Sequence, residues 1–270
     1  MQNERTSRHL NFHATSRPMA AMEIDYPHGS STGLHAHPRG QLLHAIEGVM
    51  IVRSALGSWV VPPNRAVWLA PGLEHDVRMC GDVKIRTVFV DSSVSADLPR
   101  TSCVIAVSPL LRELVVAAVR VPIDYAPGTR EERLMLLLLD QFQELDVLPL
   151  HLPMPKDARL RSVCEALIAN PQISSTAEKW AHQLGITPKT IHRLFAQQTG
   201  MSFGQWRQQA RLLYGLERLA RGERIIDIAL DSGYASQSAF TAMFRRHFGV
   251  PPSAFFGETP AAPAGGLHPL

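Results

Sequence analysis

The stretch IIDIALDSGYASQSAFTAMFRRHFG (225–249) decides the fold of the C-terminal half, because it holds two short helical patterns around a glycine turn. A small residue, Ala229, stands four positions before Gly233, where two helices must approach closely. The same element occurs 48 positions upstream as Ala181 and Gly185. Further along the offset becomes 49, so we expect the second turn to be one residue longer. The chain is therefore predicted to contain two successive helix-turn-helix units.

Capping residues predict where the helices of these units begin. Ser175 and Glu178 have the spacing of a capping box, so we expect a helix to start there. After the first turn, Thr187 is expected to cap the next helix, with Pro188 at its first position. Between the two units, SFGQWRQQARLLYGLERLARG (202–222) has long helical periodicity, and Ser202 and Gln205 at its start have the spacing of a capping box. This segment is predicted to be a rigid spacer helix.

The excess of positive over negative charge lies in the same half of the chain. The net charge of the whole chain is +3. Residues 1–155 hold 14 basic and 16 acidic residues, a balance of −2, whereas residues 156–257 hold 13 and 7, a balance of +6. This asymmetry predicts a polyanionic partner for the C-terminal part.

Residues 156–257 resemble the DNA-binding domain of the AraC/XylS family of transcriptional regulators, most specifically in GYASQSAFTAMFRRHFGVPPSAF (233–255). The resemblance implies a two-lobed helical domain whose two recognition helices enter successive major-groove segments of double-stranded DNA. Arginine and lysine can contact guanine or phosphate, and glutamine can pair with adenine. The DNA contacts implied by the resemblance are Pro188, Lys189, His192, Arg193, Ser236, Gln237, Ser238, Thr241 and Arg245.

The N-terminal part has a different texture, with short apolar runs broken by glycine and proline between residues 20 and 92. These runs predict the strands of an antiparallel β-barrel. Segments 109–119 and 130–145 are predicted helices, and the second is rich in leucine. It is expected either to cap the domain or to form a dimer seam. The proline-rich segment 148–155 predicts an extended linker at the domain boundary.

These patterns together predict an α+β multidomain chain. We expect a barrel sensor domain over 1–98 and a helical linker with a candidate dimerisation segment over 99–155. An all-α domain with two helix-turn-helix units is expected over 156–257, followed by a disordered tail over 258–270.

Two histidines one residue apart, His35 and His37, belong to a second motif. With Gln41 they have the spacing G-x5-H-x-H-x3-Q-x6-G, and PGLEH (71–75) ends in His75. Alternate residues of a strand point to the same face, so we expect His35 and His37 to project together and His75 to join them from a neighbouring strand. This spacing resembles the cupin superfamily of RmlC-like barrels, with Gln41 at the position where that family has a metal-binding glutamate. The resemblance implies a divalent metal site for zinc, nickel or iron, and the alternative is a pocket wall without metal.

A barrel followed by a DNA-binding domain is the order of AraC-type regulators, and segments 35–48 and 58–79 resemble the cupin-containing subgroup of nitroimidazole-resistance regulators. We therefore expect a transcriptional activator or repressor that is not an enzyme. A small molecule or metal in the barrel, near the histidines and Trp59 or Trp68, is expected to control it by favouring one arrangement of the domains. The alternative is a metal-dependent cupin enzyme, an oxygenase or isomerase, fused to a helical domain.

The remaining features bear on compartment and assembly. The cysteines Cys80, Cys103 and Cys164 form no CxxC pair, which is typical of reduced thiols. No apolar run reaches the length of a membrane span, and the N-terminal residues lack the apolar core of a secretory signal. We expect a cytoplasmic protein without a membrane partner, and a homodimer formed through the barrel or the leucine-rich helix.

Overall fold

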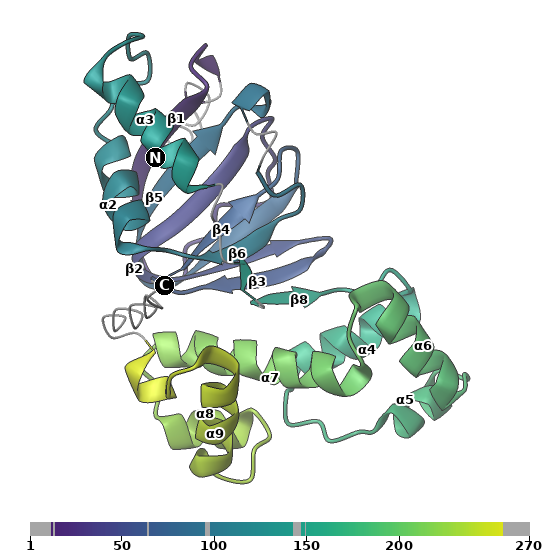
Figure 1. Ribbon diagram of the computed structural model, residues 1–270. Coiled ribbons are helices and arrows are strands. Elements are labelled where there is room, and N and C mark those ends of the chain that lie inside the picture. The colour runs from purple at the N-terminus through teal and green to yellow at the C-terminus, as the bar shows by residue number, and fades with distance from the viewer. Residues whose placement is uncertain are drawn as a thin grey trace, which may run out of the picture.

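The computed structural model describes residues 12 and 14–255, except 64, 95–97, 143–146 and 149; for residues 147 and 148 it describes the backbone. The sequence expectations for the tail 258–270 and for the end of the leucine-rich helix lie outside the described residues. Within this range a sheet comes first and a group of helices second, so that Figure 1 shows the sheet above and the helices α4 to α9 below.

An antiparallel sheet forms the N-terminal domain, as predicted, but three of its strands lie in residues 99–155, where a helical linker was expected. Its eight strands within the described residues are β1 (Met19–Tyr26), β2 (Gly40–Ser54), β3 (Gly57–Val61), β4 (Arg65–Leu69), β5 (His75–Val90), β6 (Cys103–Ala106), β7 (Val147–Leu148) and β8 (His151–Pro153). The strand order is β1-β5-β2-β4-β6-β7, and β3 joins β2 to β8. A short 3-10 turn, η1 (Ser92–Val94), follows β5.

The long strands β2 and β5 bend together halfway along their length. Their register shifts between Ala45 and Val49, and Gly48 has a φ of 78° within this irregularity. A Cβ atom on Gly48 would lie 2.4 Å from the carbonyl oxygen of Asp82, so both the backbone angle and the space require glycine. The first half of β2 pairs with β4 and the second half with β3. The two halves of β2 on either side of this irregularity therefore have different neighbouring strands.

Helices α2 (Pro109–Ala118) and α3 (Arg130–Gln141) confirm the two predicted helices and pack on each other. Ser108 and Thr129 cap them, each accepting a backbone N–H in the first turn. Leu111, Val115 and Leu138 belong to one buried cluster with residues of the sheet such as Leu42 and Trp68. The helices thus cover one face of the sheet (Figure 1).

The segment predicted as a linker is extended, but it takes part in the sheet. Its strand β8 pairs antiparallel with β3, and β7 pairs with β6. The indole Nε1 of Trp206, in the helical domain, donates a hydrogen bond of 2.7 Å to the carbonyl oxygen of Pro153. The boundary between the domains is therefore packed rather than loose.

The C-terminal domain consists of α4 (Ala158–Ala169), α5 (Ala177–Gln183), α6 (Pro188–Thr199), α7 (Phe203–Ala220), α8 (Ile225–Asp231), α9 (Gln237–Phe248) and the 3-10 turn η2 (Pro252–Ala254). The pairs α5–α6 and α8–α9 are the two predicted helix-turn-helix units, and α7 joins them. The turns span 184–187 and 232–236, so the second is one residue longer, as predicted.

Most predicted helix starts are confirmed, and one is wrong. Thr187 caps α6 with Pro188 at its start, and Ser202 caps α7 in a complete capping box. The cap of α5 is Thr176 rather than Ser175, because the Thr176 hydroxyl accepts the backbone N–H of Lys179. The carbonyl oxygen of Ser175 instead accepts a hydrogen bond from α7, which holds Ser175 in the extended segment before the helix.

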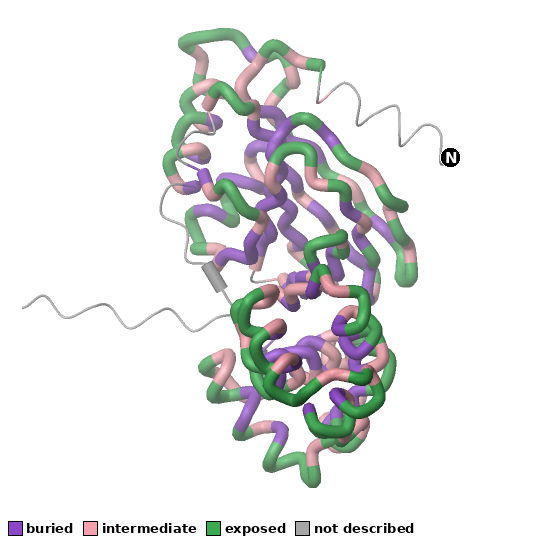
Figure 2. Tube along the Cα trace, turned by 90° about the vertical axis from the view of Figure 1, so that its right-hand side faces the viewer, coloured by how far each residue is buried: buried purple, intermediate pink, exposed green. Residues whose placement is uncertain are grey.

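The helix α7 lies directly beneath the sheet and contacts β2, β3, β5 and β8 (Figure 1). Buried apolar residues of the sheet and of the helical domain belong to one continuous cluster. Figure 2 shows these buried residues in the sheet and in the helices below it, with exposed residues along the outer turns. Within the described residues, no helix is long and apolar enough to cross a membrane.

Candidate DNA-binding surface and histidine site

Helix α6 separates its side chains into a packed face and an open face. Ile191 and Phe195 are fully buried, and the Phe195 ring packs against Phe203 with 5.3 Å between ring centroids. The residues predicted to contact DNA lie on the other face, where Pro188, Lys189, His192 and Arg193 are all exposed. Arg193 donates from Nη1 to Oε1 of Gln197 at 2.9 Å, one turn further along the same helix.

Helix α9 repeats this separation. Phe240 and Phe244 are fully buried, whereas Gln237, Ser238 and Arg245 are exposed and Thr241 is half-buried. Ser236, predicted to contact DNA, is the N-cap of α9, and its hydroxyl oxygen accepts the N–H of Ala239 at 3.1 Å. Its O–H remains a donor. All nine residues predicted to contact DNA therefore lie on or at the start of α6 and α9, and eight of them are exposed.

Helix α7 carries residues that sequence reasoning did not single out. The guanidinium groups of Arg207 and Arg211 hold backbone carbonyls of segment 171–175, which leads into α5. Arg218, near the other end of α7, forms ion pairs with Glu223 and Asp231. The repeated arginines on the predicted spacer helix were the only sign of these contacts in the sequence. Their presence does not reveal which groups they bind.

Three histidines meet at one edge of the sheet. His35 and His75 face each other in an antiparallel bridge, with backbone hydrogen bonds of 3.0 and 2.8 Å. The carbonyl oxygen of His37 accepts the N–H of Gly72 at 2.9 Å, which continues this pairing. The side-chain nitrogens of His35, His37 and His75 lie within 4.8 Å of one another. The structure therefore brings the predicted histidine set together.

The predicted reason for this meeting was partly wrong. We expected His35 and His37 to project from one strand with alternating side chains, but β2 begins only at Gly40. His35 takes part in a single bridge, and His37 lies in the loop between that bridge and β2. The pairing of segment 35–37 with the start of β5 and with the turn before it, rather than the period of a strand, brings these rings to the same side.

Backbone carbonyls orient all three imidazole rings. Each Nδ1 lies within hydrogen-bond distance of a carbonyl oxygen: 2.9 Å from Gly33 for His35, 2.6 Å from Arg39 for His37 and 2.8 Å from Leu73 for His75. A carbonyl oxygen can only accept, so each Nδ1 carries the hydrogen. In a neutral ring with the hydrogen on Nδ1, Nε2 carries the lone pair that can bind a metal. Metal-binding histidines usually donate their other N–H to a carbonyl or carboxylate oxygen in this way.

A chain of hydrogen bonds aims the amide oxygen of Gln41 at the same site. Gln41 donates from Nε2 to the Thr87 hydroxyl at 3.0 Å, and Thr87 donates to the carbonyl oxygen of Leu42 at 2.9 Å. Oε1 of Gln41 consequently faces Nε2 of His37 at 2.7 Å. A proton on Nε2 would join the two atoms in a hydrogen bond, whereas a metal ion would bind both atoms from one side.

Burial makes the proton the poorer choice. Desolvation lowers the pKa of His37, against the opposing effect of its hydrogen bond with Gln41. It also lowers the pKa of His75 to about 4, and Nε2 of His75 is buried without a hydrogen-bond partner. A neutral imidazole nitrogen that is buried and unpartnered fits a metal ligand. Three imidazoles and an amide oxygen are a donor set suited to zinc, nickel or iron.

The two tryptophans expected near an effector occupy different layers. Trp59 lies in the buried cluster inside the fold and stacks on His151, with 4.6 Å between ring centroids and 11° between planes. Trp68 lies under α2 and α3, where its Nε1 donates to the carbonyl oxygen of Pro99 at 2.8 Å. The structure thus places Trp59 and Trp68 in separate buried clusters.

Comparisons with known proteins agree with this division of the chain. Residues 21–146 match the family of AraC-like ligand binding domains, and residues 180–258 match a family of helix-turn-helix domains. These two matches define the class: a transcriptional regulator that combines a ligand-binding domain with a DNA-binding domain.

The relatives make the assignment more specific. The chain is 30% identical over 225 residues to the HTH-type transcriptional regulator NimR of Escherichia coli (strain K12), which covers 83% of this chain and 82% of NimR. It is 35% identical over 103 residues to the HTH-type transcriptional regulator RipA of Corynebacterium glutamicum, covering 38% of this chain and 31% of RipA. A solved structure of ToxT from Vibrio cholerae aligns over 89% of this chain and 98% of its own, at 11% identity and a TM-score of 0.38. The chain belongs to the AraC family of transcriptional regulators, which confirms the resemblance seen in the sequence.

Proposed function

We propose that this regulator reads double-stranded DNA through the exposed faces of α6 and α9, and that an effector at the histidine site sets its affinity for DNA. One observation supports the first part: α6 and α9 each have an exposed polar face opposite a face of buried aromatic residues, and both helices belong to the same domain. Buried aromatics fix each helix, while the opposite side chains keep donors available for phosphates and base edges.

The proposed effector site holds a divalent metal on His35, His37, His75 and Gln41, alone or together with a small molecule. The metal would supply a fixed positive charge beside Nε2 of His37 and Oε1 of Gln41, which face each other. Since β5 begins at His75 and runs on to contact α7, ordering of the site would favour one packing of the sheet against the helices.

Elemental analysis of the purified protein tests the metal. We expect about one equivalent of zinc, nickel or iron in the natural protein and its loss in a His35→Ala/His37→Ala variant. His182→Ala, which removes an exposed imidazole from α5, is the matched control and should keep the metal. The double variant should retain DNA affinity and lose its response to the metal. Equal metal content in all three proteins would contradict the proposal.

Because its relatives are transcriptional regulators, we also propose that the histidine site binds without turnover and that the protein acts in the cytoplasm. Mapping of binding sites across the genome, combined with an assay for oxidation or isomerisation of small molecules, separates this proposal from a cupin enzyme. Enriched sites without turnover support the regulator, and turnover without enriched sites supports the enzyme.

We propose a homodimer formed through α3. Leu136 and Leu137 are 48% and 44% exposed, and Arg133 and Asp140 flank them on the same exposed stripe. In an antiparallel pair of α3 helices, Arg133 of each copy would face Asp140 of the other around the leucines. Light scattering at micromolar concentration should give the mass of two chains, and a Leu136→Glu variant should give the mass of one. A natural protein that stays monomeric with and without DNA would exclude the dimer under those conditions.

A further inference from the structure

The two helix-turn-helix units are connected by more than the helix between them. Segment 171–175, which leads into the first unit, runs along one face of α7 and is held there by its arginines. Arg207 donates from Nη1 to the carbonyl oxygen of Ser175 at 3.2 Å. Arg211 donates from Nε to the carbonyl oxygen of Pro171 at 2.9 Å and from Nη2 to that of Ile173 at 3.5 Å.

Arg211 also contacts the turn of the second unit. A Cβ atom on Gly233 would lie 2.7 Å from Nη2 of Arg211, so the guanidinium group lies directly against this turn. Its Cζ atom lies 6.0 Å from the centroid of the Tyr234 ring. One guanidinium group therefore touches the entrance of the first unit and the turn of the second.

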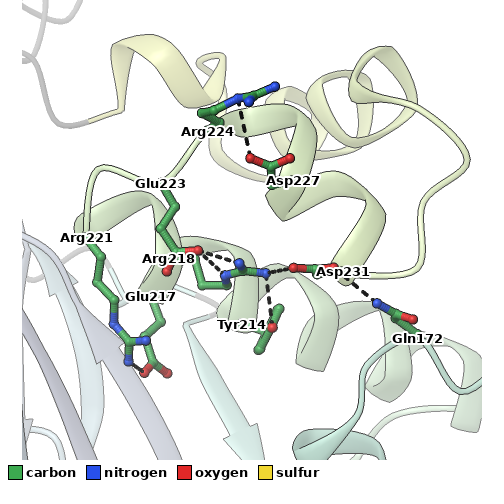
Figure 3. A network of polar contacts seen from close by, with 9 residues as sticks. All are labelled: Gln172, Tyr214, Glu217, Arg218, Arg221, Glu223, Arg224, Asp227 and Asp231. Atoms are coloured by element: carbon green, nitrogen blue, oxygen red, sulfur yellow. Dashed lines mark hydrogen bonds and ion pairs between the residues drawn. The ribbon is translucent and has the colours of Figure 1, made fainter.

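Arg218, seven residues after Arg211 on α7, makes a second connection between the units (Figure 3). Its guanidinium group binds Asp231 at the end of α8, Glu223 at 2.5 Å from Nε, and the Tyr214 hydroxyl at 3.2 Å. The second carboxylate oxygen of Asp231 accepts a hydrogen bond of 3.2 Å from Nε2 of Gln172 in the segment before α5. Arg218, Asp231 and Gln172 thus form a bridge from α7 through the second unit back to the first.

The partners of Arg218 exclude a role as a phosphate contact. Its side chain is only 17% exposed, and two carboxylates balance its charge. A guanidinium group with both edges committed to carboxylates instead holds its partners in a fixed geometry. Its effect must therefore act on the placement of α8 and of the segment before α5.

We propose that Arg211 and Arg218 are positioning residues that fix the distance and angle between α6 and α9, and so determine the spacing of the two DNA elements that the protein accepts. This inference rests on the proposed reading of DNA by α6 and α9. Two sites held rigidly at one separation bind a matching pair with high effective concentration, and a mismatched pair with almost none. One inserted base pair shifts the second element by about 3.4 Å and about a tenth of a turn.

A spacing series tests the proposal. The probe is the duplex that the natural protein selects from a random-sequence pool, together with derivatives in which one base pair is inserted or removed between the two elements. For the natural protein, we expect a change of one base pair to lower affinity on the order of 100-fold. For Arg218→Gln, the same change should lower affinity by about tenfold or less, because the two units can then adjust independently.

Two further variants separate positioning from charge and from folding. Arg224→Gln removes one positive charge from the same region. Within the described residues, Arg224, the N-cap of α8, forms its ion pair with Asp227 of that helix (Figure 3), so the spacing preference of this variant should stay natural. Gln172→Ala removes an exposed side chain and should relax the preference in the same direction as Arg218→Gln, with an unchanged unfolding temperature.

The outcomes are distinct. Failure of the natural protein to select any duplex contradicts the proposed DNA reading itself. Selection followed by an equally sharp spacing preference in Arg218→Gln and Gln172→Ala overturns the positioning role alone. Equal relaxation in Arg224→Gln would also overturn it, because that result would assign the effect to charge.

Discussion

The helices α6 and α9 share a frame but present different chemistry. Each begins with a hydroxyl N-cap, Thr187 or Ser236, and each ends at a glycine with positive φ, Gly200 or Gly249. The packed aromatic Phe195 of α6 corresponds to Phe244 of α9. The first half of α6 presents the basic residues Lys189, His192 and Arg193. The first half of α9 presents the neutral residues Gln237, Ser238 and Thr241, and its exposed cations Arg245 and Arg246 lie in its last turn.

This comparison separates the positions that build the two-helix unit from the positions that are exposed on its surface. Capping and packing positions recur along the chain because the same two-helix geometry requires them twice. The exposed positions do not recur, because packing does not constrain them. We infer that the first half of α6 contributes positive charge for phosphates, whereas the first half of α9 contributes neutral hydrogen-bonding groups for base edges.

The largest expected effect tests whether the two frames are equivalent. Phe195→Ala and Phe244→Ala should each lower the free energy of unfolding by about 3–5 kcal/mol, because each removes a fully buried ring from an aromatic cluster. Urea unfolding followed by circular dichroism measures this. Phe→Leu at the same positions is the control and should cost less. A loss below about 1 kcal/mol at one position alone would show that the frames differ.

The next effect tests the division of labour between the faces. Arg193→Ala and Gln237→Ala should each weaken binding by about 1–3 kcal/mol on the selected duplex. Only Arg193→Ala should reduce the salt dependence of binding, because only it removes a cation. Only Gln237→Ala should lose discrimination at one base pair. Changing that base pair should weaken binding of this variant less than it weakens binding of the natural protein. Fluorescence anisotropy at several salt concentrations measures both, and the reverse pattern would contradict the assignment.

The smallest expected effect tests the caps. Thr187→Ala and Ser236→Ala should each lower the free energy of unfolding by about 1 kcal/mol, since each leaves one backbone N–H without its acceptor. Thr187→Ser and Ser236→Thr keep the hydroxyl and should recover most of the loss. Thermal unfolding measures the four variants. Equal stability of the alanine and hydroxyl variants would show that these caps do not hold the helices.

Much of the helical domain could be predicted because its signals are local. The cap at Thr187, the capping box at Ser202 and the one-residue difference between the turns follow from residues close in sequence. The cap of α5 was misplaced by one residue because a long-range contact decided it: Arg207 binds the carbonyl oxygen of Ser175. Propensity alone cannot detect such a contact.

The histidine site was predictable in its members but not in its construction. The spacing motif named His35, His37, Gln41 and His75, and the structure brings them together. The pairing of segment 35–37 with the start of β5 unites them, and Thr87 orients the Gln41 amide; the latter depends on β5 lying beside β2. The bridges made by Arg211 and Arg218 were missed for the same reason, because their partners are distant in sequence.

The central claim is that α6 and α9, whose exposed side chains differ, read two DNA segments at one fixed spacing. Hydroxyl-radical footprinting of the selected duplex tests this claim most directly. We expect two protected patches on the same face of the duplex, about one helical turn apart, with Arg193→Ala weakening one patch and Gln237→Ala the other. A single protected patch, or two patches on opposite faces, would contradict the account.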